Sequence, residues 1–366
     1  MREEILDIST QMLFAMLRAS LQETCIDTSF FEKASDKDWR KCYKLAVKQG
    51  VMALAWDGLL KLPTSLLPPK ALKIEWGTKV MEYESMYHRY CTRVVELSNF
   101  YSSYSIAMMQ IKGVGFSLLY PIPSHREGGD IDIYTYSADK DRISDTEANK
   151  LADSLMIERG IDVDFKSYKH SNFYFKGIPV ENHKTFLNVK EYKIAEEMEK
   201  ILRSNMEPQK TKLSNGEIHT PSPIFNTLFI SFHAFQHYGC GLTLHHLCDW
   251  AMILKNYGLQ IPNEMTDKKF ISGVQALTQL CKKYLGSQTE ASGYDDLADQ
   301  MLNEILNPKF SLKVPVESKI GILIYKTRRL FYNHKLKNKI LPSSLFNRVL
   351  RSVISHLCSP ETIFLK

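Results

Sequence analysis

The chain has 366 residues, of which 44% are hydrophobic and 24% are charged, and its formal net charge is +6. This length suits two or three domains, and the mild positive charge suits nucleotides or other anions without requiring nucleic acid. Seven cysteines form an odd, scattered set with no CxxC pair, which argues against a disulfide framework or a zinc ribbon. No uncharged apolar run approaches the roughly 18 residues of a membrane span, so we expect a cytoplasmic protein.

Residues 1–103 are predicted to form an N-terminal helical domain. The first residues are amphipathic and carry acids within the apolar pattern, unlike a signal peptide. In residues 45–62 apolar side chains recur at steps of three and four, with Gly50 as an interruption. After a loop marked by Pro63, Pro68 and Pro69, a long helical pattern runs to about residue 103.

Residues 104–189 are predicted to form a compact α/β core. A short apolar strand at 105–112 leads through a glycine turn into a short helix, and a second strand covers 130–136. An exposed helix then ends at Gly160, and three short strand candidates follow. Residues 190–366 return to helical patterns, one of them beginning at Ser222-Pro223, and a hairpin is expected at Asn215-Gly216. We therefore expect an α+β fold that is mostly helical.

The stretch EGGDIDIYT, residues 127–135, carries two aspartates on one face of a predicted strand. Alternation puts Asp130 and Asp132 on the same side, about 6.5 to 7 Å apart along the strand, and turns Ile131 and Ile133 toward the core. Two like charges so placed repel unless a cation lies between them, and Mg²⁺ prefers carboxylate and phosphate oxygens. A lone D-x-D can also be a solvated strand face, so the pair by itself indicates only a candidate cation site.

A third acid on a neighbouring strand would complete a metal clamp. Glu181, in the predicted strand I-P-V-E-N-H, is the preferred candidate, and Asp162 with Asp164 is the rival pair. The alternative for Glu181 is a surface carboxylate that pairs with Lys184.

A turn at Lys112-Gly113-Val114-Gly115 lies between the first strand of the core and its short helix. Such a turn can present backbone N–H groups to phosphate, and its glycines would allow close approach. Alone it is weak evidence, but it precedes the D-x-D strand by only some 15 residues.

Together these motifs resemble the DNA polymerase beta-like nucleotidyltransferase superfamily, and within it the uncharacterised nucleotidyltransferase family. The resemblance spans about residues 110–250. Its elements, in chain order, are Lys112-Gly113, Leu119-Tyr120 with Pro123, Arg126, Gly129-Asp130-Ile131-Asp132, Lys169-His170, Glu181-Asn182-His183, His233 to His237, and Gly241-Leu242 to Asp249-Trp250. The chain departs from the family at His245, where members commonly have Arg, which puts that part of the site in doubt.

The resemblance implies a small palm-like mixed sheet between two helical domains, and transfer of a nucleotide by a two-metal mechanism. Asp130, Asp132 and Glu181 would hold Mg²⁺ or Mn²⁺. The donor would be an NTP, with ATP expected, and the acceptor a hydroxyl of a small molecule or a protein rather than nucleic acid. The residues expected to contact phosphate are Lys112, Gly113, Gly115, Arg126, Gly129 and Lys169.

Several histidines are expected near the substrate or behind the metal ligands. His170 is either a phosphate or acid contact or a polar strand cap, and His183 shares a strand face with Glu181. His237 and His245 are expected to face the substrate or the core, and Asp249 to orient His245 or His246. A zinc site among His233, His237, His245 and His246 is disfavoured, because the sequence HAFQH lacks the glutamate of HExxH and no third ligand is evident.

Two hypotheses from other classes remain beside the enzyme. One is a nucleotide-binding or regulatory module with the same fold but without turnover, and the other is an antitoxin-like or structural partner of another protein. Convergence of three acids would favour the enzyme over both.

Overall fold

A computed structural model describes residues 6–311, 313–346 and 349. It confirms the predicted α+β fold, mostly helical with one mixed sheet. The helices are α1 (Ile8–Gln22), α2 (Asp36–Lys48), α3 (Met52–Leu59), α4 (Lys70–Ser102), α5 (Val114–Ser117), α6 (Asp145–Glu158), α7 (Ala195–Ser204), α8 (Pro223–His237), α9 (Leu244–Tyr257), α10 (Lys268–Leu285), α11 (Asp295–Leu306) and α12 (Lys319–Lys337), with short 3₁₀ turns at Thr64–Leu66 and Pro123–His125.

The helices begin and end where the local sequence directs. Ser35 and Asp38 form a reciprocal capping box at the start of α2. Gly50 adopts a positive φ of 66° between α2 and α3, which confirms the predicted interruption. At α8, Ser222 accepts a hydrogen bond from the backbone N–H of Phe225, and Pro223 fills the first turn, as expected.

The sheet has seven strands in the order β3-β4-β5-β2-β1-β7-β6. β2 pairs with β5, and β1 with β7, in parallel, while the other neighbours are antiparallel. The hairpin of β6 and β7 turns at residues 214–215, one residue earlier than expected, because Leu213 pairs with Gly216. The strands are β1 (Ile106–Gln110), β2 (Ile131–Ser137), β3 (Val163–Asp164), β4 (His170–Phe175), β5 (Ile178–His183), β6 (Gln209–Leu213) and β7 (Gly216–Thr220).

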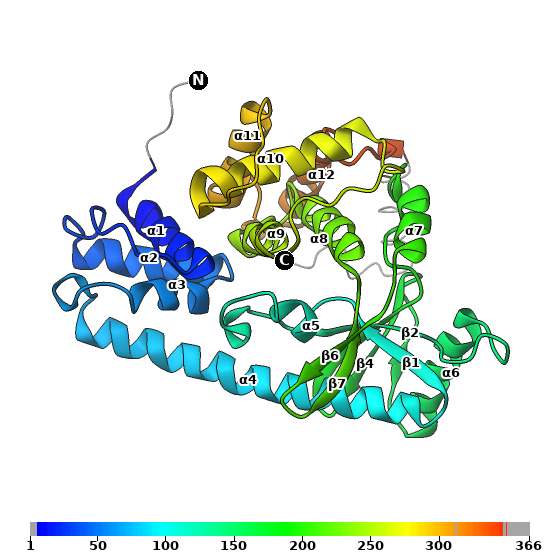
Figure 1. Cartoon of the computed structure of the whole chain (residues 1–366). Helices are drawn as coiled ribbons and strands as arrows, with labels where there is room; N and C mark the ends of the chain where they lie inside the picture. Colours follow the sequence, from blue (N-terminus) through cyan, green and yellow to red (C-terminus); the bar gives the residue numbers. More distant parts are fainter. Residues whose placement is uncertain (1–5, 312, 347–348, 350–366) are drawn as a thin grey trace.

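Helices cover both faces of the sheet (Figure 1). On one face Ile131 and Ile133 pack in a core with residues of α4 and α6, as alternation predicts. On the other face Tyr134 and Tyr136 join a larger core that also contains residues of α7, α8 and α9. That larger core includes the N-terminal helices too, so α1 packs against both α3 and α10. The even-numbered positions of β2, Asp132 among them, therefore face the C-terminal helices.

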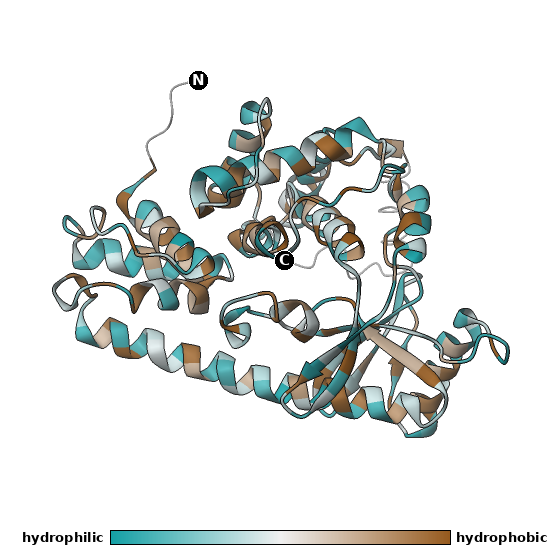
Figure 2. Cartoon of the chain, in the orientation of Figure 1, coloured by the Kyte–Doolittle hydropathy of each residue, from teal (hydrophilic) through white to brown (hydrophobic). Residues whose placement is uncertain are grey.

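Helix α4 runs beneath the N-terminal helices and on to the sheet (Figure 1). Trp76, near its start, is fully buried and joins the larger core, whereas Tyr101, near its end, is buried in the sheet core. Hydrophilic residues recur along its whole length (Figure 2), as expected for a helix with one exposed face. Among the described residues no helix is long and apolar enough to cross a bilayer.

The expected domain boundaries at residues 103 and 189 stay predictions. The first falls at the end of α4, directly before β1. Beyond the second, β6 and β7 still add to the sheet, so the sheet takes two strands from the segment expected to be a helical domain.

A buried ion pair ties the loop before β2 to α9. The Arg126 guanidinium donates from Nε and Nη2 to the two carboxylate oxygens of Asp249, each at 2.8 Å. The hydroxyl of Tyr120 donates to the same carboxylate at 2.6 Å. Burial, the largest single influence, would raise the pKa of Asp249, but the charges of Arg126 and His245 and the hydrogen bonds from Arg126 and Tyr120 together hold it below its usual value. The Asp249 carboxylate is thus charged and buried, and both of its oxygens accept hydrogen bonds from Arg126 or Tyr120.

Removing one partner of this pair should destabilise the fold strongly. Arg126→Met leaves Asp249 as an uncompensated buried charge, so we expect the free energy of unfolding in urea to fall by about 3–5 kcal/mol. Arg142→Met, at an exposed arginine, should change it by less than about 0.5 kcal/mol. The single variant Asp249→Leu should also lower the free energy of unfolding. The double variant Arg126→Met/Asp249→Leu should lower it by less than the sum of the two single decreases. Additive losses would mean that the two side chains do not stabilise each other.

Candidate active site

The parallel pairing of β2 with β5 brings two acids side by side. Asp132 on β2 is the register partner of Glu181 on β5, so both carboxylates lie on the same face of neighbouring strands. His183 lies two residues beyond Glu181 on that face. One ligand atom from each of Asp132, Glu181 and His183 lies within 4.8 Å of the other two. The third acid expected from sequence is therefore close to Asp132.

Asp130 lies outside this cluster, in the residue before β2 begins, but it interacts with it electrostatically. Burial, followed by repulsion from Asp132 and from Glu181, raises the pKa of Asp130 to about 6, and the charge of Lys112 offsets only part of this. Burial would also raise the pKa of Asp132, but the hydrogen bond from His183 and the charge of Lys112 hold it below its usual value. The two aspartates thus have opposite electrostatic environments.

His183 lies between the two carboxylates of the cluster. Its Nε2 is 3.1 Å from Asp132 Oδ1 and 3.5 Å from Glu181 Oε2, and its Nδ1 is 3.3 Å from the carbonyl oxygen of Thr185. Both ring nitrogens therefore face oxygen atoms that can accept a hydrogen bond. The hydrogen bond from His183 is also the largest cause that lowers the pKa of Glu181. His170, across from His183 on β4, has its Nε2 3.5 Å from Glu181 Oε2.

Two lysines supply positive charge to this face. Lys112 follows β1, and its charge lowers the pKa of both Asp130 and Asp132. Its ammonium is hydrogen-bonded to Nε2 of His233 on α8 at 2.9 Å. Lys169 directly precedes β4 and is partly buried, and loss of water around its ammonium lowers its pKa, while the charges of Asp132 and Glu181 act in the opposite direction. Both lysines predicted as phosphate contacts thus lie beside the acids.

Gly113 and Gly115 of the predicted phosphate turn lie where the fold itself leaves no room for a side chain. Gly113 has a φ of 67°, and a Cβ there would lie 2.7 Å from Nε2 of Gln110. At Gly115 a Cβ would lie 2.7 Å from Cγ2 of Thr220 on β7. Gly129 has open space around it, and its carbonyl accepts a hydrogen bond from Tyr90. Contact of these backbones with phosphate stays a prediction.

Other predicted residues lie at the interface with α8 and α9. Arg126 is committed to Asp249 through Nε and Nη2, and its contact with phosphate stays a prediction. Nε2 of His245 lies 3.5 Å from Asp249, the partner predicted for it, and His237 lies on α8 beside His233. The rival acids Asp162 and Asp164 are exposed, and Asp164 lies in the edge strand β3.

A pocket opens beside Asp130. Its walls include Tyr83, Tyr87 and Tyr90 from one side of α4, together with Gly113 and Arg126. Sequence reasoning did not assign these tyrosines to the site. Their spacing of four and three residues places them on one helical face, but nothing local to α4 shows that this face borders the D-x-D strand.

The carboxylate oxygens of Asp132 and Glu181 are ligands of the type that Mg²⁺ prefers. Asp132 and Glu181 offer oxygen ligands on two adjacent strands, and the pKa of Asp130 is raised by burial and then by repulsion from these two carboxylates. Mg²⁺ takes one or two carboxylates and completes its shell with water and phosphate oxygens.

Among known proteins, this chain is similar to one family and to one solved structure. The model of the family described as uncharacterised nucleotidyltransferase matches residues 35–277. A solved structure, that of an antigenic nucleotidyltransferase-like protein from Paracoccidioides brasiliensis, is 13% identical over 56% of this chain and 96% of that chain, with a TM-score of 0.37. No curated protein matches the chain. The family match includes α2 to α9 and most of α10, and thus the whole sheet with the acids on it, and this chain belongs to the uncharacterised nucleotidyltransferase family.

Proposed function

We propose that this protein is a magnesium- or manganese-dependent nucleotidyltransferase that moves an NMP from an NTP, with ATP as the expected donor, to a hydroxyl group. The acceptor would be a small molecule or a protein side chain. The observation that carries the proposal is the register of Asp132 with Glu181 on parallel strands, with His183 between them and Asp130 nearby.

Asp130, Asp132 and Glu181 would hold the metal. When bound, magnesium at such a site neutralises charge on the triphosphate and lowers the pKa of an acceptor hydroxyl, as in two-metal displacements. His183 keeps the Asp132 carboxylate oriented by donating to Oδ1 at 3.1 Å, and His170 faces Glu181 from the next strand. These contacts would hold the two carboxylates in place for the metal.

Lys112 and Lys169 supply positive charge on the same sheet face for the phosphates of the donor. Lys169 is partly buried, so its charge acts on Asp132 and Glu181 through less water than it would at an open surface. The pocket walled by Tyr83, Tyr87 and Tyr90 adjoins Asp130, and its volume of about 30 Å³ is that of a single water molecule, so the tyrosine side chains would have to move before a nucleobase could enter there.

Loss of either carboxylate of the β2–β5 pair should abolish label transfer. With labelled NTPs, Mg²⁺ or Mn²⁺ and a cell extract as the source of acceptors, Asp132→Asn and Glu181→Gln are expected to lower transfer by at least about 10³-fold. Asp164→Asn, at an exposed acid of the edge strand, is the matched control and should retain full transfer.

The same assay separates the enzyme from a nucleotide-binding module without turnover. If the wild-type protein binds NTP in the presence of Mg²⁺ but transfers no label from any NTP, the module is the correct description. If transfer survives both carboxylate substitutions, the site lies elsewhere.

Neutralising Asp130 should stabilise the metal-free protein at alkaline pH. The folded-state pKa of about 6 lies above the ordinary aspartate value of 3.8, so folding favours the protonated acid and wild-type stability falls as the pH rises from 3.8 through 6. Asp130→Asn should therefore raise the free energy of unfolding by up to about 3 kcal/mol at pH 8, and by about half of that at pH 5. Urea unfolding in EDTA at both pH values measures this, with Asp164→Asn as the control.

The same urea unfolding experiment can be repeated with Mg²⁺ in place of EDTA. Because the cation neutralises the same repulsion, saturating Mg²⁺ should stabilise the wild-type protein more than Asp130→Asn and so narrow the difference at pH 8. A variant that is less stable than wild type at pH 8 in EDTA would show that Asp130 has a structural role instead.

A further inference from the structure

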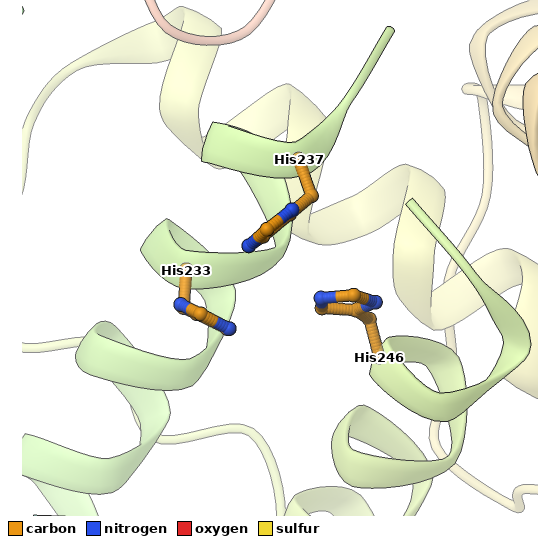
Figure 3. Close-up of side chains that lie close together, drawn as sticks. All are labelled: His233, His237 and His246. Carbon is orange, nitrogen blue, oxygen red and sulfur yellow. The ribbon is translucent and has the colours of Figure 1, made fainter. Parts of the chain in front are cut away.

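Three histidines converge between α8 and α9, apart from the carboxylates of the sheet (Figure 3). His233 and His237 lie one turn apart on α8, and His246 lies in the first turn of α9. The ring centroids are 4.8 Å apart for His233 and His237, 5.4 Å for His233 and His246, and 4.7 Å for His237 and His246. Figure 3 shows the rings turned toward the space that separates the two helices.

One nitrogen of each ring lies within 4.8 Å of the corresponding nitrogens of the other two. Around a tetrahedral metal bound at 2.0–2.1 Å, imidazole nitrogens lie about 3.3 Å apart. The ring nitrogens must therefore draw closer to one another than 4.8 Å to hold a metal in this geometry. From sequence alone no third ligand is evident for His233 and His237, and it is the packing of α9 against α8 that supplies His246.

The surroundings keep the ring nitrogens available as ligands. Burial lowers the pKa of all three histidines, to about 4 for His237 and well below the usual value for His233 and His246. A metal therefore does not compete with a proton at neutral pH. Nδ1 of His246 accepts a hydrogen bond from the backbone N–H of Thr243 at 3.2 Å and lies 3.0 Å from the Thr243 hydroxyl oxygen. In that tautomer Nε2 carries the ring proton, so a metal at Nε2 requires the proton to move to Nδ1, where the Thr243 hydroxyl oxygen can accept it.

Lys112 is the neighbour that opposes a cation. Its ammonium lies 2.9 Å from Nε2 of His233, and its charge contributes to the lowered pKa of each ring. A metal at the three rings and Lys112 at His233 thus compete, both for a nitrogen and through repulsion.

We propose that His233, His237 and His246 form a binding site for one divalent transition metal of the kind that imidazole prefers, such as Zn²⁺, Co²⁺ or Ni²⁺, in competition with Lys112. Imidazole suits these ions, whereas Mg²⁺ prefers oxygen, so this site and the carboxylates select different metals. Three protein ligands leave a fourth position for water or a substrate atom.

Titration of the metal-free full-length protein with Co²⁺, followed by visible absorption and by displacement with Zn²⁺, tests the proposal. We expect one equivalent to bind at the three rings, and 1 mM Mg²⁺ should not displace it. Single substitutions His233→Ala, His237→Ala and His246→Ala should each weaken binding by at least about 100-fold. His88→Ala, at an exposed histidine of α4, is the matched control and should bind as the wild type does.

Two further variants keep the result interpretable. His237→Gln retains a polar side chain of similar length and should also lose the metal, so circular dichroism of the metal-free variants can separate lost binding from lost folding. Lys112→Met removes the competing ammonium and should tighten binding by about tenfold or more. If Lys112→Met leaves the affinity unchanged, the competition is refuted.

The carboxylate cluster is the alternative place for a transition metal, and Asp132→Asn distinguishes the two. Under the proposal this variant still binds one equivalent of Co²⁺ with the absorption of the wild type. The proposal fails if Asp132→Asn abolishes that signal while the three alanine variants retain it, or if the folded wild-type protein binds no Co²⁺ and no Zn²⁺. Neither outcome bears on nucleotidyl transfer, which the label-transfer assay decides separately.

Discussion

The pairing of β2 with β5 is the constraint on which the candidate site depends. Side chains alternate between faces, so a slip of one residue would turn Glu181 away from Asp132 and place Asn182 in the site. A buried polar network on the opposite face prevents such a slip. The Asn149 amide of α6 donates to Thr135 of β2 and to Asn182 of β5, and Asn182 donates in turn to Asp153. Since these groups are buried, a shifted register would leave them without partners, at a cost of about 1–3 kcal/mol for each.

The collected charges explain why lysine and histidine accompany the acids. Three carboxylates on one buried sheet face would repel one another if nothing neutralised them. Lys112, Lys169 and His183 lower the pKa of Asp132, whereas burial, followed by repulsion from Asp132 and Glu181, still raises the pKa of Asp130. A site in this state has a place for one further positive group, which is consistent with the proposed metal.

Much of this arrangement follows from local sequence patterns. The D-x-D alternation, the strand I-P-V-E-N-H and the cap at Ser222-Pro223 are each readable within about ten residues, and the structure has the corresponding strands and helix there. Contacts between residues that are far apart in sequence cannot be predicted from such local patterns. Arg126 and Asp249 are 123 residues apart in sequence, and nothing near either residue indicates the other. The same holds for His246, which meets His233 and His237 only because α9 packs on α8, and for the tyrosines of α4.

The parallel pair of β1 with β7 has a consequence for the order of folding. β1 pairs with β2 within some thirty residues, but its other edge meets β7 through Met109 and His219, more than a hundred residues later. As the chain leaves the ribosome, that edge of β1 has no strand to pair with until residues 209–220 have been made. An unpaired strand edge is a template for aggregation, and closing so long a loop is slow. Once β7 is in place, β6 forms this outer edge of the sheet. Its sequence is charged and polar, which disfavours pairing with a strand of another molecule.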